Sequence, residues 1–261
     1  MIQIYAVGVN TFREAIRNRI FASLVMFAIA MLLLTLAVSS ASLHEEVRLM
    51  KDLGLFLVST FSVLIAIFIG VNLLYKEIER KTIYTIMPKP IHRAQFLLGK
   101  FAGLAWTMAV QVAVMGLVLA LQFWLLDARF GVEMVQAVWL AYMEVVVMVA
   151  VALLFSSFST PFLSGLLTFG VFAVGRFVDR LATLKLGDPS ERTETHEQIS
   201  AVIRGVAKVW PDLSLYNVTP NVVHGAPVTW SFVGSATLYG LSYAAVILLC
   251  ACVVFQRRDF I

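Results

Sequence analysis

Charged side chains lie inside two apolar runs of this 261-residue sequence, where they could form an ion pair or a polar lining. Glu144 and Arg176 lie about 15 Å and about 9 Å from the same surface when residues are counted at helical rise. Because a charge in hydrocarbon needs a partner, we expect the two to meet. Asp179 and Arg180 follow on the same helical side, and Asp179 is an alternative partner for Arg176. The group is predicted to be either an internal ion-pair cluster or the lining of a transport path.

The sequence does not contain the catalytic and metal-binding motifs that its histidines, serines and cysteines could form. The only His-Glu pair, His44-Glu45, is followed by Leu49 where a zinc peptidase needs its second histidine, and no G-x-S-x-G occurs. Cys250 and Cys252 are two residues apart in an apolar helix and point to different faces. We therefore expect neither an enzyme active site nor a metal site in this chain.

A nucleotide site is likewise not expected. Gly99-Lys100 resembles the end of a phosphate-binding loop, but Ala94 replaces its first glycine and Phe101 replaces the magnesium-binding Ser or Thr. If the chain takes part in ATP-driven transport, another polypeptide must supply the ATPase. We predict no cofactor in this chain itself.

Composition predicts an all-α, polytopic membrane protein. Hydrophobic residues make up 60% of the chain and charged residues 14%, and several apolar runs are long enough to cross about 30 Å of hydrocarbon. The basic residues gather beside these runs, so they indicate membrane orientation and not nucleic-acid binding. We expect six spans, at 20–39, 53–75, 101–126, 134–158, 162–184 and 231–255. The fourth and fifth spans are the least regular, because they carry charges and are separated only by the turn Ser159-Thr160-Pro161. A broken or partly re-entrant fifth helix is the alternative to an intact span.

The distribution of lysine and arginine predicts the orientation. Eleven of these residues fall at the N-terminus, between spans two and three, and at the C-terminus, against three in the short loops of the opposite side. This bias places both termini in the cytoplasm. The apolar run that follows the first arginines is longer than a cleaved signal peptide requires, so we expect the run to remain as a span.

Two amphipathic helices are predicted outside the spans. In residues 1–19, Tyr5, Val9, Phe12 and Ile16 share one helical side, which favours an interface helix on the inner membrane surface over a simple extension of the first span. In the extracytoplasmic loop 185–230, Asp188-Pro189-Ser190-Glu191 is typical of a helix start, and an apolar stripe then runs to Pro211. This outer helix is expected to be a lid or a docking surface for an extracytoplasmic partner.

The cytoplasmic loop 76–100 is predicted to be rigid. Its charged first part reads as helix, Pro88 and Pro90 disfavour helix around Lys89, and a helical pattern resumes at Arg93. A flexible linker would instead be rich in Gly and Ser. The loop is therefore expected to form a helix, a stiff corner and a second helix.

This loop resembles the inner-loop pattern of type 2 ABC transporter permeases. The similar residues are Glu77, Glu79, Thr82, Ile86-Met87, Pro90, Arg93 and the run from Phe96 to Lys100. The ending from Phe255 to Phe260 and the N-terminal amphipathic helix are also similar to those of the family. Lys81 departs from the pattern, which commonly has glycine before the threonine.

The resemblance implies a single permease domain over residues 1–261, in the inner (plasma) membrane of a bacterial cell. Its implied partners are a second permease copy or homologue and two cytoplasmic ATPase subunits, which bind ATP and magnesium. A coupling helix between spans two and three would dock on the ATPase through Glu77, Glu79, Thr82, Pro90 and Arg93. The same charges are otherwise expected to anchor span ends at lipid headgroups. The alternative function is an ATP-independent channel, secondary transporter or membrane scaffold, and the residues do not identify a substrate.

Overall fold

The computed structural model describes residues 2–40, 45–79, 92–183, 205 and 210–257. Within these residues the chain is helical between turns and contains no strand, which confirms the predicted all-α class. The helices are α1 (Ile2–Ile16), α2 (Arg19–Ser40), α3 (Glu46–Glu79), α5 (Arg93–Leu125), α6 (Val132–Ser156), α7 (Pro161–Thr183), the 3₁₀ turn η1 (Ser214–Tyr216), α9 (Thr219–Val223) and α10 (Trp230–Arg257).

Five of these helices, α2, α3, α5, α6 and α10, are long and apolar enough to cross a membrane. They correspond to five of the six expected spans, and α3 and α5 continue as helix well beyond the apolar runs. The remaining expected span corresponds to α7, which contributes a shorter apolar stretch, Pro161–Phe177, within the described residues. The six-span count therefore stays a prediction.

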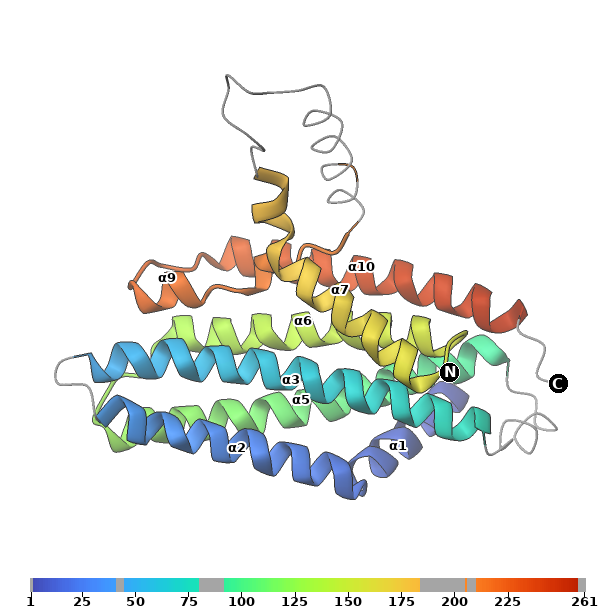
Figure 1. Cartoon of the computed structure of the whole chain (residues 1–261), viewed down its shortest axis with the longest axis horizontal. Helices are drawn as coiled ribbons and strands as arrows, with labels where there is room; N and C mark the ends of the chain where they lie inside the picture. The colour runs from blue at the N-terminus through green and yellow to red at the C-terminus, as the bar shows by residue number, and fades with distance from the viewer. Residues whose placement is uncertain (1, 41–44, 80–91, 184–204, 206–209, 258–261) are drawn as a thin grey trace.

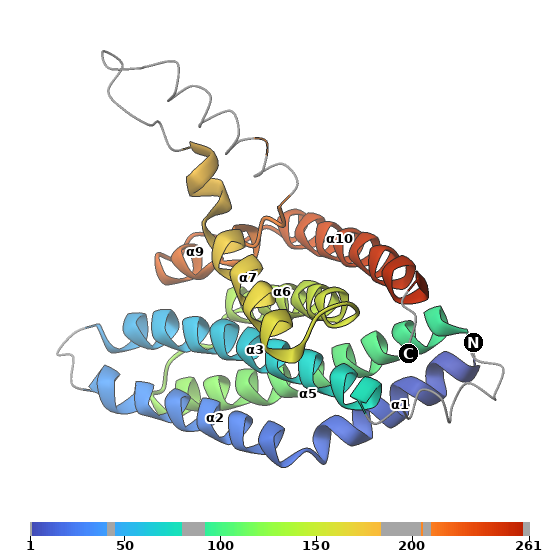
Figure 2. The ribbon, with the colours of Figure 1, turned by 45° about the vertical axis from the view of Figure 1, so that its right-hand side comes forward.

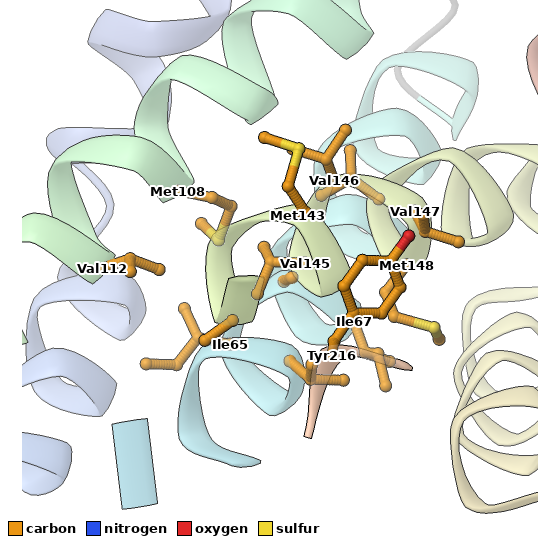
Figure 3. Packing of buried hydrophobic residues seen from close by; sticks show 14 of the residues in the cluster. Ile65, Ile67, Met108, Val112, Met143, Val145, Val146, Val147, Met148 and Tyr216 are labelled. Carbon is orange, nitrogen blue, oxygen red and sulfur yellow. The ribbon is translucent and has the colours of Figure 1, made fainter. Parts of the chain in front are cut away.

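Helix α6 is the centre of the bundle and packs against α3, α5, α7 and α10 (Figures 1 and 2). Every residue from 145 to 153 is buried, because neighbouring helices surround this part of α6 on all sides. Figure 3 shows the resulting core, in which aliphatic and methionine side chains of α3, α5 and α6 pack with the ring of Tyr216. Helix α1 and the C-terminal end of α10 lie at the same end of the bundle (Figure 1).

Helix α1 packs on α5 through small residues. Gly8, Thr11 and Ala15 are buried at helical spacing. Gly8 lies against Gly99 and Gly103 of α5, and Thr11 lies against Gly103. A Cβ atom added to Gly103 would lie 2.5 Å from the Gly8 carbonyl oxygen. Glycines four apart thus let the two backbones come into contact, as in membrane helix pairs of the small-xxx-small type.

The apolar stripe that the sequence singled out in α1 faces away from α5. Tyr5 is 74% exposed and Ile16 is 43% exposed. Asn18 lies between α1 and α2. Its Oδ1 accepts a hydrogen bond from the Ile20 amide at 3.0 Å and so caps the N-terminus of α2. Part of the stripe is thus exposed on the surface of the bundle. Its place on the inner membrane surface stays a prediction.

Residues 210–223, here called the return segment, lead the chain from the end of α7 back into the bundle. Trp210 Nε1 donates to the Val171 carbonyl at 3.2 Å, and the Leu213 amide donates to the Gly175 carbonyl at 3.1 Å. Farther along, the segment is buried against α3 and α6. Its buried apolar side chains are Leu213, Tyr216, Val218 and Val222. Residues 210–223 of the expected outer loop thus contribute side chains to the core, whereas residues 224–230 are mostly exposed.

Candidate functional site

Glu144 lies midway along α6 and is completely buried. At about 1.5 Å per residue its Cα is about 18 Å from either end of this helix. An uncompensated carboxylate at such a depth would be strongly unfavourable, so its partners decide whether it can remain ionised.

Arg176 of α7 supplies the opposite charge, as the sequence predicted. Its Nε donates to Glu144 Oε1 at 2.9 Å and its NH2 donates to Oε2 at 3.1 Å, which is the two-pronged geometry that a guanidinium offers a carboxylate. The guanidinium also lies 5.4 Å from the centre of the Phe172 ring, one helical turn earlier. The ion pair therefore joins α6 to α7.

Ser59 of α3 completes the site, and sequence reasoning missed it. Its hydroxyl donates to Glu144 Oε2 at 2.6 Å and accepts a hydrogen bond from Arg176 NH2. Ser59 and Ser62 are buried polar residues three apart within an apolar run, and this spacing was the available signal. One carboxylate thus holds three helices, and both of its oxygens are already engaged.

Tyr216 of the return segment lies near this site. Its hydroxyl donates to the Ala236 carbonyl of α10 at 3.3 Å, and Gly240 leaves the space that the phenol oxygen needs. Burial raises the pKa of the Tyr216 hydroxyl, and the nearby Tyr239, Glu144 and Asp212 raise it further. The phenol is therefore a neutral hydrogen-bond donor at physiological pH.

Two glutamines of α5 hold other helices through buried hydrogen bonds. Gln122 Nε2 donates to the Leu32 carbonyl of α2 at 2.6 Å, and its Oε1 accepts from the Thr35 hydroxyl at 3.2 Å. Gln111 Nε2 donates to Ser62 Oγ of α3 at 3.1 Å. Such bonds between apolar helices act as polar links where water is excluded.

The predicted docking residues are only partly described. Glu77 and Glu79 belong to α3, but their side chains lie outside the described residues, as do Thr82 and Pro90 entirely. Arg93 begins α5, and its NH1 donates to the Gln256 carbonyl at 3.1 Å.

An aromatic pair extends this link between α5 and α10. The Phe96 and Phe255 rings stack with centroids 6.3 Å apart. The beginning of α5 is thus attached to the end of α10 by a hydrogen bond and by a ring contact.

Asp179 and Arg180 lie on α7 beyond Arg176, and their side chains lie outside the described residues. Their predicted place in the charge cluster stays a prediction. Among the residues that the structure does describe, no group of three or more His, Cys, Asp or Glu side chains is placed to share a metal ion, and both cysteines are free.

The arrangement of long apolar helices around buried polar links is that of an integral membrane protein. The model of the family described as ABC-2 family transporter protein matches residues 5–260. The chain belongs to the ABC-2 transporter family. A comparison with curated proteins gives no match. As an ABC-2 permease it is a multi-pass membrane protein. Members of this family are typically non-enzymatic membrane components that pair with ATPase subunits.

Proposed function

We propose that this ABC-2 protein is the membrane-spanning subunit of an ATP-binding cassette exporter. The family match across residues 5–260, which includes all described helices except the first three residues of α1, carries the proposal. In it, two copies of a separate cytoplasmic subunit hydrolyse ATP with magnesium, and a second copy or homologue of this chain completes the transport unit.

The proposed topology has six spans with α7 as the fifth, and both termini in the cytoplasm of the inner membrane. The lysine and arginine bias supports this orientation, and so does the common end at which α1 and the end of α10 lie (Figure 1). Helix α7 has 23 residues, which at about 1.5 Å per residue suits a membrane crossing.

The proposed contact with the ATPase is the connection from α3 to α5. Glu77, Glu79, Thr82, Pro90 and Arg93 are its docking residues in this proposal. The attachment of Arg93 and Phe96 to the end of α10 supports it, since force applied at the start of α5 would reach a second helix directly.

Charge reversal at the two ends of α3 tests the contact. Glu79→Lys is expected to abolish copurification with the cognate ATPase. It is also expected to abolish ATP-dependent export from whole cells. Glu46→Lys changes the same residue type at the opposite end of the same helix, where Glu46 is exposed, and is expected to leave both unchanged. Unchanged copurification and export in Glu79→Lys would contradict the docking role, and export without any ATPase would contradict the exporter assignment.

We propose that Glu144, Arg176 and Ser59 position helices α3, α6 and α7 and do not line a transport path. The observation that supports this role is that both carboxylate oxygens already bind donors. Glu144→Gln should then lower stability and export together. Reduced export by a variant of unchanged thermal stability would instead indicate a path-lining role.

A further inference from the structure

A hollow of about 1080 Å³ lies where α1 turns into α2, beside α3 and the first residue of α7. Its wall includes Arg13, Arg17 and Arg19 together with Asn72, Ile20 and Phe68. The turn that brings the arginines together is fixed, because the Asn18 side chain caps α2 between Arg17 and Arg19.

Among the described residues that line this basic hollow, positive charges outnumber negative ones. The one acidic residue of its wall is Glu14, which lies 3.8 Å from Lys100 Nζ. Within the described part of the chain, Arg13, Arg17 and Arg19 form no ion pair. Three exposed guanidinium groups therefore face a space that favours an anion, and their planar donor sets suit phosphate oxygens.

The basic hollow lies at the level where the apolar helices end. The apolar run of α2 follows directly after Arg19, and in the sequence the apolar run of α3 ends before Lys76, about one helical turn after Asn72. Headgroups of a bilayer lie at this boundary. An anion held here is therefore at the height of lipid phosphates.

Apolar surface continues from the basic hollow along the bundle. Ile20 is 49% exposed and Phe68 is 38% exposed, and both belong to its wall. Leu64, one turn before Phe68 on α3, is exposed as well. A ligand with both a phosphate and a hydrocarbon chain matches this combination better than a small soluble anion does.

We propose that the basic hollow binds the phosphate of an anionic phospholipid from the leaflet next to it, with an acyl chain along Ile20, Phe68 and Leu64. The lipid would bridge the α1–α2 turn and α3 at the end of the bundle, in addition to the direct packing of α2 on α3. The inference is independent of any ATPase and can be tested with the purified full-length chain.

The first experiment measures lipid binding to the chain by native mass spectrometry, with phosphatidylglycerol, phosphatidylcholine and glycerol phosphate as probes. Arg13→Gln combined with Arg17→Gln is expected to weaken phosphatidylglycerol binding about 30-fold, since each basic residue near an anionic lipid strengthens binding about fivefold. The matched control, Arg48→Gln with Lys51→Gln, removes two positive charges at the other end of α3 and should leave binding unchanged. Phosphatidylcholine binding should not depend on either pair.

The second experiment uses the unmodified chain in nanodiscs that contain a photoactivatable phosphatidylglycerol, so it does not depend on the folding of a variant. Peptides that include residues 10–20 and 64–73 are expected to carry most of the label. Label spread evenly around the bundle, or equal weakening by the control pair, would overturn the proposal. Competition by glycerol phosphate as strong as that by lipid would show a soluble phosphate site and would overturn the lipid assignment.

Discussion

Glu144 and Lys100 are the two charged side chains that are buried in the described part of the chain, and their surroundings differ. Glu144 lies in the middle of the bundle, with both carboxylate oxygens bonded at 2.6 to 3.1 Å by side chains of α3 and α7. Lys100 is only 1% exposed, but it lies near the end of the bundle, and its Nζ is 3.8 Å from the partly exposed carboxylate of Glu14. The Phe96 ring is 5.8 Å from the same ammonium group.

The difference shows how depth decides the way a charge is accommodated. In the middle of the bundle Glu144 has no solvent-exposed surface, so its carboxylate requires protein donors in fixed positions. Near the end, a long side chain can reach a partly hydrated partner, and the close packing of α1 on α5 covers its stem. Four substitutions test this contrast, in order of expected effect.

Glu144→Ala is expected to lower the free energy of unfolding by about 3–5 kcal/mol, because it leaves the largely buried guanidinium of Arg176 without its counter-charge. The measurement is unfolding in mixed detergent micelles. The double variant Glu144→Met with Arg176→Met removes both charges and should recover most of the loss. An equal loss in the single and double variants would show that packing, and not charge pairing, is what the site contributes.

Ser59→Ala is expected to lower the same free energy by about 1.5–3 kcal/mol, since a hydrogen bond to a charged group is lost. The matched control is Ser242→Ala, at an exposed serine of α10 that donates only to carbonyls of its own helix. That control should change stability by less than about 0.5 kcal/mol. No difference between the two would mean that the carboxylate does not depend on its third helix.

Gly103→Ala is expected to cost about 1–3 kcal/mol, because the new methyl group would meet the Gly8 carbonyl and the Thr11 side chain. Gly165→Ala serves as its control, since a Cβ there has no neighbour within 4 Å, and it should be neutral or slightly stabilising in a helix. A cysteine pair across α1 and α5 would report separation of the helices. Retained cross-linking and stability in Gly103→Ala would rule out close backbone packing.

Lys100→Met is expected to change stability by about 1 kcal/mol or less. Methionine replaces the stem of the side chain, and the carboxylate of Glu14, at 29% exposure, can remain hydrated. The same micelle titration measures the change. A loss as large as that in Glu144→Ala would contradict the influence of depth that the comparison suggests.

The sequence was sufficient for the long helices and for the Glu144–Arg176 contact. Apolar length defines a span directly, and the cost of an isolated charge in hydrocarbon makes partners of two charges at comparable depth. These inferences need no knowledge of how helices rotate about their axes.

The features that the sequence did not predict depend on that rotation. The apolar stripe of α1 identified one face, but Gly8, Thr11 and Ala15 form the face that packs on α5, because backbone proximity between helices favours small residues over large ones. Ser59 was missed for a related reason, since one hydroxyl in an apolar run does not reveal what it faces. Residues 210–223 looked polar enough for an outer loop, and their burial depends on bonds to α7 and α10 that lie far away in sequence.

The return segment has a mechanical consequence. It is bonded to α7 through the carbonyls of Val171 and Gly175, and to α10 through Tyr239 and the carbonyl of Ala236. Because the segment between these attachments is short and packed, it restricts the distance between α7 and α10. A tilt of α7 would therefore move α10 as well. The C-terminal end of α10 is bonded to the start of α5 at Arg93, so a movement of α7 would reach α5 through α10.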